Sequence, residues 1–276
     1  MSYENYRPTG YRLLPEVVKN LLIINGIMYL ATMILMQKGI DLIDLLGLHY
    51  PTSEKFKVYQ FVTYMFMHDN TSIMHILLNM LALYMFGSAV ENVWGGKRFL
   101  IFYILTGLGA AFAHYAIVYY QLNPEISFLN QYINAESTSQ MTNILNTEAF
   151  KYRYGQELYD AVNTNGLTPT ESISYASQMM TQLLNAPVII GASGAVYGVL
   201  LAYGMLFPNS LLYLFFAIPV KAKYVVVIYG VIELYSGITG GGGNVAHFAH
   251  LGGLLTGIII ILFWRSKNKQ RRDDQF

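Results

Sequence analysis

The chain has no cysteine and few charged residues. The absence of cysteine from all 276 residues excludes a disulfide framework, a thiolate nucleophile and a thiolate metal site. Charged residues make up 12% of the chain, about half the roughly 25% of an ordinary globular domain. A net charge of +1 provides no basic field, so we expect no nucleic-acid partner. So little charge cannot cover a soluble core, and the composition indicates a membrane protein.

Six apolar runs approach the length of about 20 residues that crosses a bilayer. They cover residues 20–37, 72–93, 99–121, 187–207, 222–238 and 245–264. The runs predict an all-α polytopic membrane protein, a bundle of six transmembrane helices forming a single domain over 1–276. The further apolar segment 208–221 is interrupted by Pro208 and Pro219. It is too short to span, and we expect it at the membrane interface.

The basic residues predict the orientation of the chain. An even number of spans places both termini on one side, and Lys and Arg concentrate in cytoplasmic loops. Twelve of the 17 basic residues lie in the tails, 1–19 and 265–276, in the turn at 94–98, and at Lys221 and Lys223. Both termini should therefore be cytoplasmic.

Between the third and fourth spans lies a polar segment, 122–186, with six acidic and two basic residues. We expect it to be a helical extracytoplasmic insertion. Its last part predicts a helix, with Thr168 as N-cap, Pro169 in the first helical position and Glu171 completing a capping box. Apolar residues then recur at helical spacing: Ile173, Ala176, Met180 and Leu184. The amphipathic element either forms a structural cap on the membrane face or binds a substrate or partner.

Polar residues inside apolar spans are costly and tend to be functional. In the fourth span Ser193 lies between Gly191 and Gly194. Gly194 and Gly198 form a small-residue step that lets another helix approach closely. Packing alone can explain these glycines, and a serine within a membrane helix often bonds its own i−4 carbonyl.

The sixth and second spans each carry a pair of polar residues on one helical face. His247 and His250 are three residues apart, and His75 and Asn79 are four apart. Two histidines can also bind a metal, but no cysteine or carboxylate lies within the sixth span to complete a site, so we expect no metal. Gly253 and Gly257 form a second close-approach step, on the sixth span.

The topology brings these residues to matching depth. The second, fourth and sixth spans all run inward, so their polar residues lie near the outer ends. A serine nucleophile, an imidazole base and oxyanion donors are then available together. Tyr197, one turn below Ser193, is placed to pack against the imidazole. No aspartate or glutamate in these spans is placed to orient the histidine, so we expect no orienting carboxylate, which predicts a dyad.

Five motifs resemble, in the same order, those of the rhomboid family of intramembrane serine proteases. They are His75-Ile-Leu-Leu-Asn79, Glu91-Asn-Val-Trp-Gly-Gly, Gly191-Ala-Ser193-Gly, Tyr197-Gly and Ala246-His-Phe-Ala-His250-Leu-Gly-Gly. The resemblance runs through residues 20–121 and 187–264. The chain departs from the family at Tyr59-Gln60, where many members carry Trp-Arg, and in the length of the insertion.

The resemblance implies which residues carry the reaction. Ser193 would be the nucleophile and His250, rather than His247, the general base. The backbone N–H of Ser193 would form the oxyanion hole with His75 and Asn79. The supporting residues would be Tyr197, His247, Gly191 and Gly194, and Glu91 would belong to a structural hydrogen-bond network. The glycine-rich stretch 240–243 is similar to the family's flexible outer cap.

The implied reaction is the hydrolysis of peptide bonds within or near the membrane segments of single-pass or polytopic proteins. It needs no cofactor, and its expected setting is the cytoplasmic membrane of a bacterium. One alternative is a non-catalytic rhomboid-like protein that binds membrane helices, although such proteins lack the serine or the histidine. Another is a transporter with a histidine relay. A transporter would more naturally carry carboxylates in its spans and an inverted repeat, which the sequence lacks.

Overall fold

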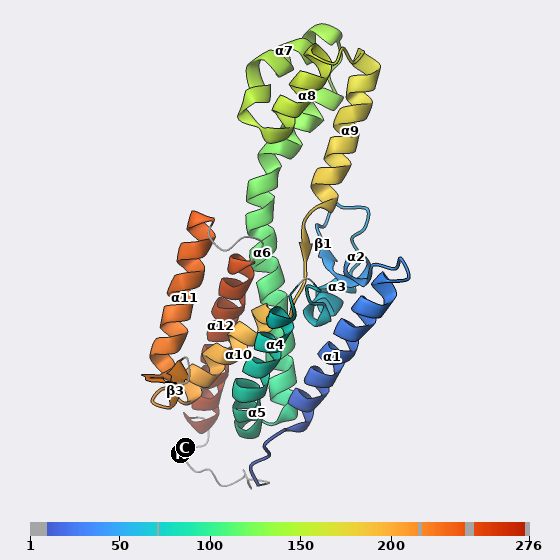
Figure 1. The fold of residues 1–276 in the computed structure, drawn as a ribbon. Coiled ribbons are helices and arrows are strands. Elements are labelled where there is room, and N and C mark those ends of the chain that lie inside the picture. Colours follow the sequence, from blue (N-terminus) through green and yellow to red (C-terminus); the bar gives the residue numbers. More distant parts are fainter. Residues whose placement is uncertain (1–9, 71, 215–216, 241–245, 274–276) are drawn as a thin grey trace. The chain divides into compact units, whose positions relative to one another are not determined.

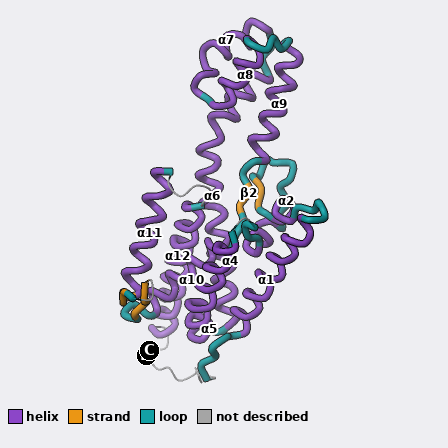
Figure 2. The backbone as a smooth tube through the Cα atoms, viewed as in Figure 1, coloured by secondary structure: helices purple, strands orange, loops and turns teal. Residues whose placement is uncertain are grey.

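A computed structural model describes residues 10–70, 72–214, 217–240 and 246–273. Helices dominate these residues and the strands are short (Figure 2). Close packing divides the chain into two compact units. Unit 1 comprises Met1–Gly47, Tyr59–His114 and Ile189–Phe276, and unit 2 comprises Leu48–Val58 and Tyr115–Val188.

Unit 1 contains most of the long helices (Figure 1). Its α-helices are α1 (Glu16–Met36), α2 (Leu42–Leu46), α3 (Gln60–Thr63), α4 (Ile73–Ala82), α5 (Ser88–Trp94), α10 (Ser193–Leu206), α11 (Ala222–Thr239) and α12 (His247–Asp273). A 3₁₀ turn, η1 (Tyr64–Phe66), follows α3, and a π-helical turn, η2 (Leu83–Gly87), joins α4 to α5. Helix α6 (Gly96–Ile133) begins in unit 1 and continues into unit 2.

Within the described residues, five helical runs are long and apolar enough to cross a membrane. They are Glu16–Met36, Ile73–Trp94, Gly96–Ile133, Ala222–Thr239 and His247–Lys267. They match five of the six predicted spans and confirm the predicted all-α membrane fold. A single residue, Gly95, separates the helices of the second and third spans. Its φ of +79° suits a residue without a Cβ.

The fourth span, predicted over 187–207, is wrong in its first part. Helix α10 begins only at Ser193 and has 14 residues. The preceding chain is extended at β2 (Val188–Ile189), and Gly191 has a φ of +117°. A right-handed helix cannot pass through that conformation, so the apolar run is split into a loop and a short helix.

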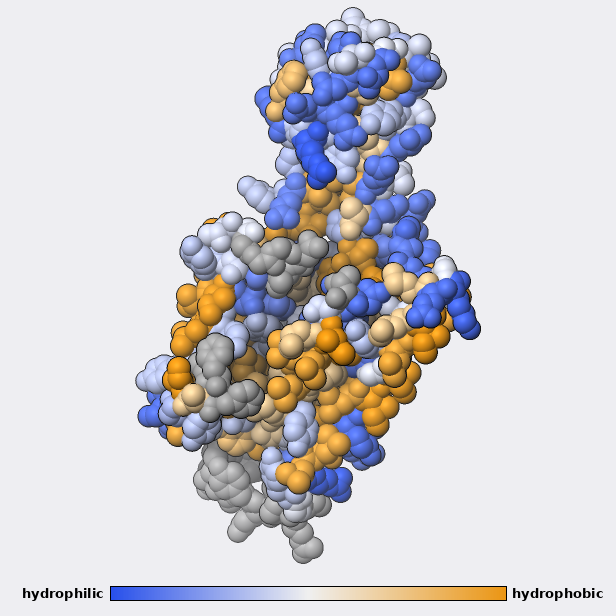
Figure 3. Space-filling view, viewed as in Figure 1, coloured by the Kyte–Doolittle hydropathy of each residue, from blue (hydrophilic) through white to orange (hydrophobic). Residues whose placement is uncertain are grey.

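The surface of unit 1 is apolar over its membrane helices. Figure 3 shows hydrophobic residues along the visible face of α1, where Ile23, Ile27 and Leu30 are exposed. Val231 on α11 and Ile259 on α12 are exposed in the same way. In a helix all backbone groups are paired internally, so such faces can meet hydrocarbon at no hydrogen-bonding cost. These surfaces are those of an integral membrane protein.

Glycines let α10 approach α12, and these helices lie side by side in Figure 1. A Cβ added at Gly253 would overlap the carbonyl oxygen of Gly194. A Cβ at Gly198 would lie 2.7 Å from the Cβ of Thr106 on α6. The predicted close approach of the small-residue steps is therefore confirmed.

Glu91 caps the amino terminus of α1. Its Oε1 accepts from the N–H of Val17 at 3.0 Å, and its Oε2 accepts from the N–H of Val18 at 2.8 Å. The first N–H groups of a helix have no partner within it, and a carboxylate there also complements the helix dipole. The buried Glu91 therefore joins α5 to α1, in line with the structural network that the resemblance implies.

Unit 2 has a core of its own. It contains α7 (Thr138–Glu148), η3 (Ala149–Lys151), α8 (Arg153–Asn163), α9 (Pro169–Asn185), the short strand β1 (Leu48–His49) and the carboxyl-terminal part of α6. Phe128, Leu129 and Tyr132 of α6 pack in this core with apolar residues of the other helices. The third predicted span, 99–121, lies within α6, and this packing explains why the helix continues beyond it to Ile133 in spite of Pro124.

The helix predicted in the last part of the insertion is confirmed as α9. Thr168 is its N-cap, Pro169 opens it, and Glu171 completes the capping box. Hydrogen bonds from the side chain and backbone of Thr168 hold the pKa of Glu171 below its usual value. The buried stripe is shifted by one position from the predicted one, because Met179 and Leu183 face the core more fully than Met180 and Leu184.

The segment 208–221 contains two short paired strands. Strand β3 (Leu211–Leu214) pairs antiparallel with β4 (Ile218–Lys221), and Leu211 lies opposite Lys221. Its place at the membrane interface stays a prediction. Helix α11 ends at Gly240, which has a φ of +69°. The rest of the glycine-rich stretch, 241–243, lies outside the described residues.

We predict that Gly253→Ala destabilises the protein, because the added methyl group overlaps the backbone of Gly194. Overpacking of this kind costs about 1–3 kcal/mol. Thermal unfolding in detergent should show a lower midpoint. Gly26→Ala in α1 is the matched control, since nothing lies within 4 Å of a Cβ there. Equal midpoints for the two variants would contradict the close approach.

Candidate active site

Ser193 stands at the amino-terminal end of α10. The turn before it is held by the N–H of Gly191, which donates to the carbonyl of Tyr64 at 2.9 Å. Because Ser193 opens the helix, its backbone N–H belongs to the first turn and has no partner within the helix. Its hydroxyl oxygen lies 2.8 Å from Nε2 of His250. Ser193 of α10 therefore contacts an imidazole of another helix, α12. It is not a mid-helix serine bonded to its own backbone.

His250 lies in the first turn of α12 and is buried. The ring of Tyr197 stacks on its imidazole, with centroids 4.2 Å apart and planes inclined by 9°. Tyr197 stands one turn after Ser193 on α10, so one short helix contributes both the hydroxyl and the aromatic surface. The stack restricts rotation of the imidazole and keeps Nε2 directed at Ser193.

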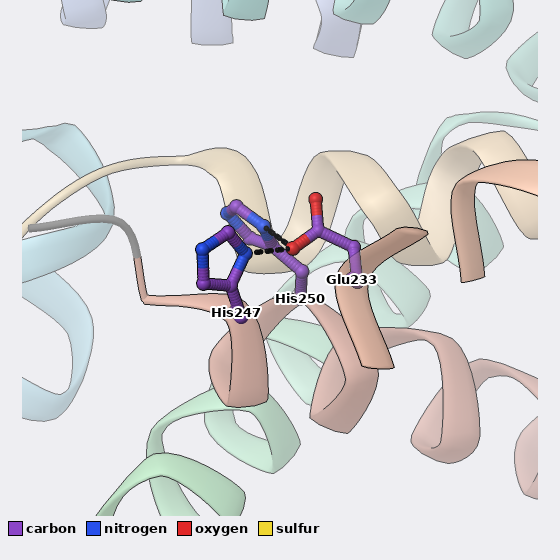
Figure 4. Close-up of side chains that lie close together, drawn as sticks. All are labelled: Glu233, His247 and His250. Atoms are coloured by element: carbon purple, nitrogen blue, oxygen red, sulfur yellow. Dashed lines mark hydrogen bonds and ion pairs between the residues drawn. The ribbon is translucent and has the colours of Figure 1, made fainter. Parts of the chain in front are cut away.

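A carboxylate completes the arrangement from a third helix (Figure 4). Glu233 of α11 is buried, and its Oε2 lies 2.6 Å from Nδ1 of His247 and 3.1 Å from Nδ1 of His250. Its Oε1 accepts a hydrogen bond from the hydroxyl of Tyr197. Glu233 thus contacts both histidines and the ring that stacks on one of them.

The two imidazoles meet this carboxylate differently. Nδ1 of His247 is aligned for a hydrogen bond to Oε2, whereas Nδ1 of His250 lies within ion-pair distance without that alignment. An ionised carboxylate only accepts hydrogen bonds, so it favours the proton of each ring on Nδ1. For His250 this leaves Nε2 with a free lone pair toward Ser193, the tautomer that a general base requires.

The expectation that no carboxylate orients the histidine is wrong. Glu233 precedes His247 by 14 residues and lies on another helix, so no spacing rule connects them. The usable signal is that Glu233 is a lone acidic residue in an otherwise apolar span, where an ionisable side chain usually has a partner. The premise for excluding a metal, that no carboxylate is available beside the histidines, is wrong for the same reason.

His75 lies close to Ser193. A Cβ at Gly191 would be 3.6 Å from Nε2 of His75 and 3.6 Å from the Oγ of Ser193. The space left by the missing side chain is thus bounded by an imidazole nitrogen and the serine hydroxyl. On its other side, the ring of His75 meets His68 edge-on, with centroids 5.5 Å apart.

Asn79 lies one turn below His75 on α4 and is buried. Its amide donates one hydrogen bond to the carbonyl of His75 at 2.9 Å. A side-chain amide has two N–H donors, so this bond uses one and fixes the direction of the other. Gln60, at the position where many family members carry arginine, is buried and donates to the carbonyl of Leu45 at 3.3 Å.

The model of the Rhomboid domain matches residues 55–124 and 167–267, together more than half of the chain. The chain belongs to the rhomboid family. Rhomboids are in general serine proteases that act within membranes, and some members are inactive. A comparison with curated proteins finds no match.

The matched ranges of this rhomboid cover residues of unit 1 and also 55–58, 115–124 and 167–188 of unit 2. The unmatched stretch 125–166 holds the end of α6 together with α7 and α8, all of them in unit 2. The candidate site lies wholly within matched residues of unit 1. Unit 2 therefore contains a segment in addition to the rhomboid domain.

Proposed function

We propose that the chain is an intramembrane serine endopeptidase in which Ser193 is the nucleophile and His250 the general base. The observation that carries the proposal is the 2.8 Å contact between Ser193 Oγ and His250 Nε2. A serine hydroxyl is a weak nucleophile until a neighbouring imidazole takes its proton.

The reaction proceeds in two halves. Ser193 Oγ attacks the carbonyl carbon of the scissile peptide bond while His250 Nε2 takes the hydroxyl proton. The tetrahedral intermediate collapses, His250 gives the proton to the leaving nitrogen, and an acyl-enzyme remains. Water then attacks the ester with His250 as base, and the serine hydroxyl is restored.

The negative oxygen of the tetrahedral intermediate needs donors. The backbone N–H of Ser193 has no partner within α10, because Ser193 opens the helix. His75 borders the space beside Gly191. The remaining N–H of Asn79 is the third donor in the proposed oxyanion hole. Loss of one such donor typically costs about 10²–10³ in rate.

Glu233 is the proposed positioning residue. It contacts Nδ1 of His250 and binds the hydroxyl of Tyr197. Its negative charge stabilises the imidazolium that forms when the base accepts a proton. Hydrogen bonding to Glu233 also fixes His247, which we place in a supporting role.

The proposed substrates are single-pass or polytopic membrane proteins, cut within or next to their membrane segments. The apolar surface of unit 1 supports a reaction within a bilayer, where a substrate helix must unwind before its carbonyl reaches the serine. Small or helix-destabilising residues near the cut are the expected preference. The proposed setting is a bacterial cytoplasmic membrane with both termini cytoplasmic, as the distribution of Lys and Arg favours.

A serine-directed fluorophosphonate should label the wild-type protein and fail to label Ser193→Ala. The reason is that only a serine activated by a neighbouring base reacts readily. Gel fluorescence of the purified proteins in detergent measures the label. Ser210→Ala, whose hydroxyl only donates to the carbonyl of Phe207, should label like the wild type. Equal labelling of wild type and Ser193→Ala would refute the assignment.

His250→Ala should lower kcat for a transmembrane substrate by roughly 10⁴-fold or more, since the proton acceptor is lost. His247→Ala should keep measurable activity, because its ring contacts Glu233 and not Ser193. Cleavage of a fluorescent transmembrane substrate in proteoliposomes measures both. The reverse pattern would exchange the roles of the two histidines.

Glu233→Gln should lower kcat by about tenfold or more while KM and the unfolding midpoint stay near the wild-type values. The amide oxygen remains an acceptor, but the charge that stabilises the imidazolium is lost. Glu233→Asp should recover part of kcat because it restores the charge. A fall in the unfolding midpoint with unchanged kcat would show that Glu233 is only structural.

A further inference from the structure

We propose that Glu233, His247 and His250 also form a binding site for Zn²⁺, and that the bound ion inhibits the protease. The three side chains each offer a ligand atom, and these atoms lie within 4.8 Å of one another. The inhibition rests on the proposed function, whereas the binding of the ion does not.

The donor set fits zinc. Imidazole nitrogens and a carboxylate oxygen are the ligands that this ion takes in proteins. Two histidines and one glutamate leave the fourth tetrahedral position for water, an arrangement found in zinc enzymes. Hard cations such as Mg²⁺ and Ca²⁺ prefer oxygen ligands, so they fit these two histidines poorly.

The distances are close to those of a tetrahedral site. With metal–ligand bonds of about 2.0–2.1 Å, neighbouring ligand atoms are about 3.3 Å apart. Glu233 Oε2 lies 2.6 Å from Nδ1 of His247 and 3.1 Å from Nδ1 of His250. Small rotations of the side chains would lengthen these two distances to the required value.

Contacts with Tyr197 already hold two of the three ligands in place. Oε1 of Glu233 accepts from Tyr197, and the His250 ring stacks on the same residue. Such outer contacts orient metal ligands and strengthen binding. Access is provided by His247, whose side chain is 13% exposed, at the very start of α12.

The ion would act through the tautomer of His250. A metal at Nδ1 takes that lone pair, so the single proton of the neutral ring must sit on Nε2. The N–H then points at Ser193 Oγ and donates to it, and Nε2 has no lone pair to receive the serine proton. At the same time, the negatively charged carboxylate of Glu233 binds the ion. Occupation of the site therefore removes the general base without displacing Ser193.

Binding is tested in the Ser193→Ala variant, purified without a histidine tag. Isothermal titration with Zn²⁺ should show one site per chain, and Co²⁺ should give the visible absorption bands of a tetrahedral complex. Adding His247→Ala or Glu233→Gln should weaken binding by about tenfold or more, since loss of even an outer contact costs 10–100-fold. His114→Ala, a histidine of α6 outside the cluster, should bind like the parent.

Inhibition is tested with the wild-type enzyme in proteoliposomes. Zn²⁺ should lower kcat, EDTA should restore it, and the residual activity of His247→Ala should need at least about tenfold more Zn²⁺ for the same fractional loss. An absence of stoichiometric binding by Ser193→Ala, or equal binding by the His247→Ala and His114→Ala variants, would overturn the site. Binding without inhibition of an active enzyme would overturn the inhibitory role. If no chain variant cleaves any substrate but the titration succeeds, the proposed function fails and the metal site stands.

Discussion

The backbone contact between α10 and α12 determines the geometry of the site. Gly194 and Gly253 meet where neither helix has a side chain. Ser193 is the residue before the first glycine, and His250 lies one turn before the second. The hydroxyl and the imidazole are therefore set at hydrogen-bonding distance by how closely two backbones can approach. A larger residue at Gly253 would separate the two helices, and with them the reacting pair.

A residue of a third helix, Glu233 of α11, also helps to determine the geometry of the site. Glu233 is an ionisable group in an apolar span, where an unpaired charge is costly. It is paired on both oxygens, with two imidazoles on one side and a phenol on the other. These contacts connect α11 to α10 and α12 at the point where the chemistry is expected. The orientation of the base thus depends on one carboxylate.

The sequence predicts the local features of this protein well. Hydropathy identifies five spans that the structure contains, and the Thr168–Glu171 capping box identifies α9. Features that depend on tertiary packing were not predictable in this way. The start of α10 follows from the backbone conformation of Gly191, and the extension of α6 follows from the core of unit 2. Composition alone reveals neither.

The residues of the candidate site also differ in whether the sequence predicts them. Ser193, His250 and Tyr197 lie in local sequence motifs, and the structure brings their side chains into contact, as the order of the spans predicts. Glu233 carries no motif, because its role depends on the packing of α11 against α12, with residues 241–245 between them outside the described chain. A single acidic residue in an apolar helix indicates that a partner exists, without indicating which one.

The shortness of α10 has a consequence within the bilayer. Its 14 residues extend about 21 Å, well below the roughly 30 Å of the hydrocarbon core. A helix of this length cannot cross the hydrocarbon core on its own. At least one of its ends therefore lies within the thickness of the core, where its unpaired backbone groups need water or protein as partners.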